Sequence, residues 1–272
     1  MGITRAVVLG WMVPLFGLIS ALGAISGVAA EEPVLRVVVG DWEPYIGQEL
    51  TDEGMAAVIL RESFAHGGYK VEIDYLPWKR AFTEAQAGHY DASYLWAERE
   101  DRFEYFYFSV PVIVTSNVFF YRKDSDFDWS TYEDLKQYNV GAVLGYLYAP
   151  DWKDAMETHR FHPIMINSDK IGFEMLKTGR LDAFPASYLV GLNILRDDFS
   201  PVQRRVIEVH PRKINVHGLH LIVAKTVPNA QDIIATFNEG YSRLAKEGRF
   251  REIALKYLRL DHPDNTGNVL PE

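Results

Sequence analysis

A long β-rich run of the chain reads Val110-Pro111-Val112-Ile113-Val114-Thr115-Ser116-Asn117-Val118-Phe119-Phe120-Tyr121-Arg122. Its β-branched and aromatic residues favour an extended strand. A second β-rich run, Leu219–Ala224, lies far downstream. Between the two runs strands and helices alternate, which predicts an α/β unit inserted between two crossing strands. The inserted elements are expected at Thr131–Gln137 (helix), Val140–Leu144 (strand), Lys170–Lys177 (helix) and Leu181–Phe184 (strand).

The same alternation precedes the first run. Strands are expected at Leu35–Gly40, Val71–Leu76 and Tyr90–Leu95, and helices at Met55–Ala65 and Trp78–Ala87. This order is typical of a parallel sheet covered by helices. Two further helices, at about Asn229–Lys246 and Phe250–Leu258, follow the second run. We therefore predict an α/β fold of two lobes joined by two crossing strands, with a ligand cleft between the lobes.

The expected domain boundaries follow from the two crossings. Residues 31–121 form the first segment of lobe 1, residues 122–217 form lobe 2, and residues 218–260 return to lobe 1. The tail at 261–272 is rich in Pro, Gly, Asp and Asn and is expected to be flexible.

The N-terminal residues 1–30 have the order of a secretory signal peptide. Arg5 is followed by an apolar run, Ala6–Ile25, and then by the small residues Val28-Ala29-Ala30 before polarity begins. This order predicts cleavage at about Ala30/Glu31. The alternative is an uncleaved membrane anchor, since the apolar run approaches the ~20 residues that a span needs. Glycines and Pro14 interrupt the run, which favours the signal peptide.

Composition limits the partners of the exported chain. The 272 residues include 28 Lys+Arg and 37 Asp+Glu, a net charge of −9. Nucleic acid and anionic lipid require a basic surface, so neither is expected as a partner. The chain has no cysteine, which excludes both disulfides and a lipid-modified cysteine after the signal. We expect a soluble periplasmic protein without stable membrane insertion, and no dinucleotide or phosphate-loop fingerprint indicates a cofactor.

Six motifs occur in order over residues 33–260. They are Trp42-Glu43-Pro44-Tyr45, Leu76–Ala81, Ala87–Ala92, Arg102 separated by five residues from Phe108-Ser109-Val110-Pro111, the second-lobe pair Val140–Tyr146 and Leu176–Ala183, and the closing stretch Phe237–Tyr257. In this order they resemble the type II periplasmic solute-binding proteins of family 3, which serve polar amino acid uptake transporters. The resemblance implies a monomer whose lobes close like a hinge on a small polar solute and present it to an ABC-type permease.

Four aromatic residues are candidates for the cleft. Trp42 and Tyr45 follow the first strand, and Trp78 and Trp96 also lie near strand ends. Ligands bind at the carboxyl edge of open α/β sheets, and an aromatic face there provides apolar area and can hold a cation. The alternative is that these residues are ordinary aromatics at the edge of the core.

Two arginines compete for the role of carboxylate ligand. The resemblance implies that Arg102 holds a ligand carboxylate, for which a planar guanidinium is suited because it donates two parallel hydrogen bonds. Arg99 lies three residues earlier, where the family usually has Thr or Ser, so the assignment stays open between the two. Without the resemblance, residues 97–102 would be interpreted as a solvated charged loop.

The second lobe departs from the family pattern. Ser187 stands where the resemblance places the aspartate that accepts a ligand's α-ammonium, and a neutral hydroxyl cannot supply that ion pair. Another small carboxylate, or a ligand whose amine is met by aromatic side chains, is therefore favoured over ordinary L-amino acids. Tyr146 follows a second-lobe strand, where backbone N–H groups at a helix start would receive an anionic group.

A metal site and an enzymatic role are the weaker interpretations. His159-x-x-His162 and His217-x-x-His220 do not follow a metalloprotease pattern, and residues i and i+3 of a strand point to opposite faces. We expect no metal and no catalytic residue. The alternatives are a dehydratase-like enzyme on the same fold, with Glu43, Glu98 and Glu100 as candidate acids, and a module that presents its ligand to a sensory receptor.

Overall fold

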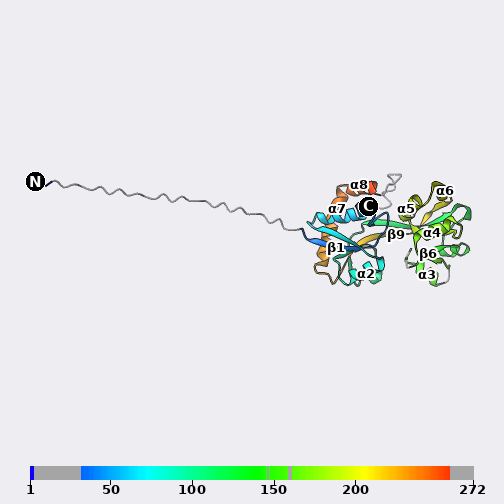
Figure 1. Cartoon of the computed structure of the whole chain (residues 1–272). Coiled ribbons are helices and arrows are strands. Elements are labelled where there is room, and N and C mark those ends of the chain that lie inside the picture. The colour runs from blue at the N-terminus through cyan, green and yellow to red at the C-terminus, as the bar shows by residue number, and fades with distance from the viewer. Residues whose placement is uncertain (3–31, 145, 147, 159–160, 258–272) are drawn as a thin grey trace. The chain divides into compact units, whose positions relative to one another are not determined.

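The computed structural model describes residues 1–2, 32–144, 146, 148–158 and 161–257 (Figure 1). Residues 3–30 of the predicted signal peptide with its cleavage site, the predicted tail at 261–272 and His159 lie outside the described residues. None of the helices in the described ranges has the length and apolar character needed to cross a membrane.

The larger sheet has the strand order β2-β1-β3-β9-β5-β8, and β4 pairs with β9 beside this path. Its strands are β1 (Val34–Val39), β2 (Lys70–Tyr75), β3 (Ala92–Ala97), β4 (Phe106–Phe108), β5 (Ile113–Arg122), β8 (Ala183–Ser187) and β9 (Ile207–Ala224). Strand β1 is parallel to both β2 and β3, whereas β9 runs antiparallel to β3, β4 and β5. A two-stranded parallel sheet pairs β6 (Gly141–Val143) with β7 (Ile164–Ile166).

Among the α-helices of the described residues, five lie where helices were expected, and the helices at Trp152–Glu157, Tyr188–Asp198 and Pro201–Arg204 were not predicted. The α-helices are α1 (Met55–Ala65), α2 (Trp78–Gln86), α3 (Trp152–Glu157), α4 (Asp169–Lys177), α5 (Tyr188–Asp198), α6 (Pro201–Arg204), α7 (Ala230–Lys246) and α8 (Arg249–Tyr257). In Figure 1, α2, α7 and α8 lie near β1, and α3 to α6 lie near β6, with β9 running between the two groups. The expected α/β fold with two crossing strands is confirmed, whereas the lobe boundaries stay a prediction.

The buried apolar residues fall into three clusters that the crossing strands connect. One cluster is drawn mainly from residues 35–113 and 219–254, and two smaller ones lie within residues 118–207. Strand β5 contributes Ile113 to the first cluster, Val118 and Phe120 to the second and Phe119 to the third. Successive side chains of a strand alternate in direction, so Phe119 and Phe120 enter cores on opposite faces of β5.

The second half differs from the expected elements in the extent of one strand, in an additional helix and in the type of another helix. Strand β9 begins at Ile207 rather than Leu219, because its polar first half pairs with β5 and carries no apolar run of its own. Pro211 lies where the β5–β9 register shifts, the position in a sheet that tolerates a missing N–H. Helix α5 was not predicted, since its first two turns are almost wholly apolar and lack a polar face. The segment Tyr132–Gln137 is a 3-10 helix.

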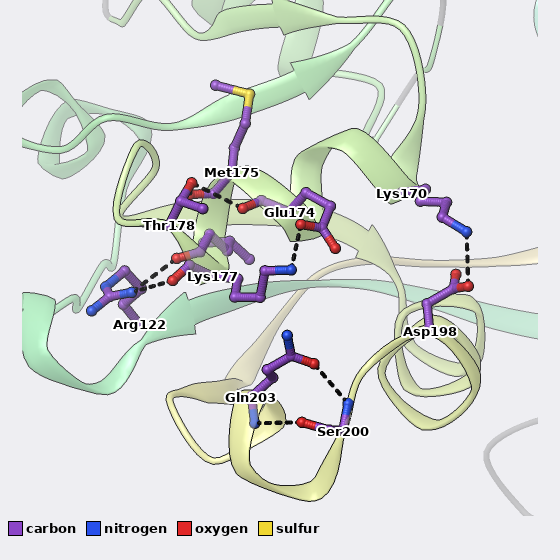
Figure 2. A network of polar contacts seen from close by, with 10 residues as sticks. Arg122, Lys170, Glu174, Met175, Lys177, Thr178, Asp198, Ser200 and Gln203 are labelled. Carbon is purple, nitrogen blue, oxygen red and sulfur yellow. Dashed lines mark hydrogen bonds and ion pairs between the residues drawn. The ribbon is translucent and has the colours of Figure 1, made fainter.

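Helix α4 is held at both ends and along its side, and Figure 2 shows the contacts of Arg122 at its C-terminal end and of Lys170 with Asp198. The Ser168 hydroxyl accepts a hydrogen bond from the Ile171 N–H at 3.4 Å and caps the N-terminus. At the other end, Nη1 of Arg122 donates to the carbonyl oxygens of Leu176 and Lys177 at 3.1 and 2.9 Å. Lys170 pairs with Asp198 of α5 at 2.8 Å. The first residue of α4, Asp169, therefore has a well-defined position.

Replacing Arg122 with methionine is expected to lower the free energy of unfolding by about 1–2 kcal/mol, because the last carbonyls of α4 lose their charged donor. Urea denaturation at pH 7 measures this loss. The control is Asp124→Ala, which removes only the exposed ion pair to Arg122 and should cost less than about 1 kcal/mol. Equal losses in the two variants would mean that the ion pair, and not the carbonyl contacts, carries the effect.

Candidate functional site

A cavity of about 660 Å³ is lined by residues from both halves of the chain. Polar side chains of the two crossing strands line it, namely Thr115 and Asn117 of β5 and Asn215 and His217 of β9. Seven of the residues predicted for the ligand site line the same cavity: Trp42, Trp78, Trp96, Arg99, Arg102, Tyr146 and Ser187. Their role in ligand binding stays a prediction, but the structure brings them to one place.

Tyr45 is the predicted site residue that does not line the cavity. Its side chain is 1% exposed and packs under Trp42, with ring centroids 4.6 Å apart. The Tyr45 hydroxyl lies 3.5 Å from the Thr115 hydroxyl, which in turn lies 2.9 Å from that of Ser187. Burial raises the pKa of Tyr45, so its phenol is neutral. Tyr45 therefore supports the floor of the cavity from beneath.

A β-bulge in β3 brings consecutive side chains to the cavity. The β3–β9 register shifts between Tyr94 and Trp96, and Leu95 has a φ of 67°. A left-handed backbone at a bulky residue is strained, and such strain is found at functional sites. Leu95 and Trp96 both line the cavity as a result, although neighbours in a regular strand face opposite sides.

Trp96 and Trp78 form a rigid aromatic wall. Nε1 of Trp96 donates to the Ser93 hydroxyl at 2.7 Å, and Nε1 of Trp78 donates to the Asp41 carbonyl at 3.2 Å. The two rings meet edge to face with centroids 5.1 Å apart. Gly40 allows this arrangement, because a Cβ there would lie 2.5 Å from the Trp78 ring.

Arg102 enters the cavity wall as an unneutralised cation. Its guanidinium lies over the rings of Trp96 and Phe82, at 5.0 and 5.4 Å from their centroids, and Nη1 donates to the Ala97 carbonyl at 2.6 Å. Burial lowers the pKa of Arg102 to about 10, which still leaves it charged at neutral pH. Within the described part of the chain, no carboxylate forms an ion pair with it.

Arg99 is in a different state, although it lines the same cavity. Its Nε and Nη2 donate to the two carboxylate oxygens of Asp101 at 3.0 and 2.5 Å, which neutralises the guanidinium. A ligand carboxylate would have to displace Asp101. The geometry therefore favours Arg102 over Arg99 as the anion-binding residue.

Tyr146 lines the cavity, and its backbone N–H and its hydroxyl are both hydrogen-bonded within the chain. Its backbone N–H already donates to the Val143 carbonyl at 3.2 Å, and the next helix, α3, begins only at Trp152. The N–H of Tyr146 is therefore engaged within the chain and does not lie at a helix start. Instead, the Tyr146 hydroxyl donates to Oδ2 of Asp169 at 3.2 Å.

Asp169 is the main residue that sequence reasoning missed. It lines the cavity as the first residue of α4, half-buried, and burial raises its pKa to about 6. In the sequence, an aspartate directly after Ser168 is an ordinary first-turn acid, and nothing there distinguishes it as a site residue. The polar cavity residues of strand β5 could have been found from the sequence, because Thr115 to Asn117 interrupt an otherwise apolar run.

His217 and His220 of β9 point to different sides of the strand, as residues i and i+3 of a strand do. His217 lines the cavity, whereas His220 is 5% exposed and its Nδ1 lies 2.8 Å from the Ser109 carbonyl oxygen. Burial, and then the proximity of His220, lowers the pKa of His217, so its imidazole is neutral at pH 7.

Among the described residues, no group of three or more His, Cys, Asp or Glu is arranged to hold a metal ion. Of the three candidate acids, Glu98 alone lines the cavity.

The family profile of bacterial extracellular solute-binding proteins, family 3, matches residues 35–260. The chain belongs to this family. Members of this family are mainly non-enzymatic solute-binding proteins, and their extracellular character implies a periplasmic or extracellular location for this family 3 protein. None of the curated protein sequences compared with it is a match.

Solved structures of the same type II fold resemble this family 3 protein over most of its length. A histidine kinase sensor domain with similarity to periplasmic binding proteins has a TM-score of 0.68 at 20% identity, covering 84% of this chain and 97% of that chain. An ancestral arginine-binding protein bound to arginine has a TM-score of 0.68 at 19% identity, with coverages of 84% and 99%. The ligand-binding core of GluR0 from Nostoc punctiforme, in complex with L-glutamate, has a TM-score of 0.64 at 14% identity, with coverages of 82% and 98%.

Proposed function

We propose that this family 3 protein captures a small polar, carboxylate-bearing, amino-acid-like solute and delivers it to an ABC-type uptake transporter. The observation that carries the proposal is Arg102, a charged guanidinium stacked on Trp96 in a cavity lined from both halves of the chain. A half-buried cation without a carboxylate partner is costly, and an anionic ligand removes that cost.

Hinge closure is the mechanism in this proposal. Strands β5 and β9 connect the two groups of buried clusters, and both strands contribute residues to the cavity. A rotation about these two strands brings the Trp96 side of the cavity toward the Tyr146 side around a bound solute. The protein then acts as a periplasmic monomer, after removal of residues 1–30, and binds its solute without turnover.

A thermal-shift panel of amino acids, dicarboxylates, aromatic acids and polyamines tests this function. A carboxylate at about 100 times its Kd should stabilise the protein by about 2.7 kcal/mol and raise Tm by about 5–10 °C. Mass spectrometry of the recovered ligand should find it unchanged. No shift with any carboxylate would contradict solute capture, and conversion of the ligand would favour the enzyme interpretation instead.

A sensory role is the second candidate, because the histidine kinase sensor domain has the same fold over 84% of this chain. Both roles predict the same ligand binding and differ in the partner of the loaded protein. Stimulated ATP hydrolysis by a reconstituted permease supports transport. A change in receptor kinase activity, without an effect on a permease, supports the sensory role.

A further inference from the structure

The cavity carries opposite charges on its two sides. Arg102 follows β3, and Asp169 begins α4, and neither forms an ion pair with another residue that the structure describes. Arg99 does not balance Asp169, because Asp101 already neutralises it through two hydrogen bonds. One cation, Arg102, and one half-buried anion, Asp169, are thus left for the ligand to satisfy, beside the exposed Glu98.

We propose that Asp169 receives the cationic group of the ligand and thereby selects zwitterions over simple carboxylates. The inference rests on the proposed function, in which Arg102 holds the ligand's carboxylate. Asp169 would thus supply from the start of α4 the negative charge that Ser187 cannot supply from the end of β8.

The geometry around Asp169 suits this role. The Tyr146 hydroxyl donates to Oδ2, and the backbone N–H of Asp169 also donates to its own carboxylate. The two oxygens of a carboxylate offer about four acceptor positions, so positions remain for an ammonium or guanidinium group. The backbone of Asp169 is held in place because Ser168 caps α4. Arg122 anchors the other end of the helix and Lys170 ties it to α5 (Figure 2). A fixed acceptor loses little entropy on binding, which increases its contribution to affinity.

Glu98 is the other carboxylate of the cavity and is the less suitable one. Its side chain is 55% exposed, and Nε2 of His220 lies 3.8 Å from its Oε1. Water screens an exposed carboxylate, so its attraction for a ligand cation is weak. Asp169 is half-buried, and the same cation gains more there.

The matched test compares amino acids with the corresponding 2-oxo acids, which keep the carboxylate and lack the amine. Binding to the full chain is measured by titration calorimetry at pH 7.5, in the wild type, Asp169→Asn and Glu98→Gln. The wild type should bind an amino acid of the set at least 10-fold more tightly than its 2-oxo acid. Asp169→Asn should lose at least 10-fold for the amino acid and less than 3-fold for the 2-oxo acid, whereas Glu98→Gln should change both by less than 3-fold.

The pH dependence provides a second readout. Burial raises the pKa of Asp169 to about 6, so affinity for the amino acid should rise between pH 5 and 7 as the carboxylate ionises. The other titratable or charged residues of the cavity are Glu98, Arg99, Arg102, Tyr146, Tyr148 and His217. Protonation of His217 would also lower the affinity at low pH, because the imidazolium carries the same charge as the ligand's cationic group. The rise should persist in His217→Gln and disappear in Asp169→Asn.

The ligand-free variant shows whether Asp169→Asn is folded. The pKa of Asp169 is higher in the folded state than in the unfolded state, so the ionised carboxylate opposes folding at pH 7.5. Asparagine at this position should therefore leave Tm unchanged or raise it. Equal wild-type affinity for amino acids and 2-oxo acids, or a loss in Glu98→Gln instead of Asp169→Asn, would overturn the assignment and leave the proposed function intact. A wild type that binds neither class would overturn both.

Discussion

Replacing Arg102 with alanine is expected to weaken carboxylate binding by at least about 30-fold, because truncating one partner of a desolvated charge pair costs 2–5 kcal/mol. Titration calorimetry with a ligand from the thermal-shift panel measures the loss. The guanidinium lies over Trp96 and Phe82, so its removal also takes away packing, and a fall of a few degrees in Tm is expected. Circular dichroism should show an unchanged fold.

Arg99→Ala is the matched control for this variant. It removes an arginine of the same loop that lines the same cavity, but one that Asp101 already neutralises. Its effect on affinity should stay below about 3-fold, as expected for an exposed ion pair. Retained affinity in Arg102→Ala, or an equal loss in both variants, would reject Arg102 as the carboxylate ligand.

The second large effect concerns stability and the contact between α1 and α7. A Cβ at Gly240 of α7 would lie 1.9 Å from the Ser63 carbonyl oxygen of α1. Both are fixed backbone positions, so Gly240→Ala must push the two helices apart. We expect a loss of about 3 kcal/mol in the free energy of unfolding and a fall of about 6–12 °C in Tm, although Gly→Ala within a helix is otherwise stabilising by about 1 kcal/mol.

Ser242→Ala serves as the control, because Ser242 lies on the exposed face of the same helix. It should change stability by no more than about 0.5 kcal/mol in guanidinium denaturation. A neutral or stabilising Gly240→Ala would show that α1 and α7 do not approach this closely in solution.

Local sequence signals were most informative in the first half of the chain. Helix α1 has the predicted bounds Met55–Ala65, since its apolar spacing is helical and Gly68, with a φ of 75°, follows its end. The strands β1, β2 and β3 lie within two residues of the expected positions at both ends. The second half was less predictable, because β9 and α5 owe their structure to pairing with β5 and to burial rather than to periodicity.

Within the candidate site, the sequence by itself determined the residues that follow strands of the first sheet. Trp42 and Arg102 reach the cavity because the carboxyl ends of parallel strands meet at one edge. Trp96 lies near the end of β3 and reaches the cavity through the bulge at Leu95. The family motifs pointed to the same loops. They did not separate Arg99 from Arg102, because spacing does not reveal which guanidinium a neighbouring carboxylate neutralises.

Only the tertiary structure decided the charge on the opposite side of the cavity. Asp169 and Ser187 begin or precede different helices, and they line the same cavity only because of how α4 and β8 pack around β5. Burial, which raises the pKa of Asp169, is likewise a property of the assembled cavity and not of the residue's neighbours in sequence. Local patterns therefore specified the elements of this protein, whereas desolvation and long-range packing specified which of its charges remain for a ligand.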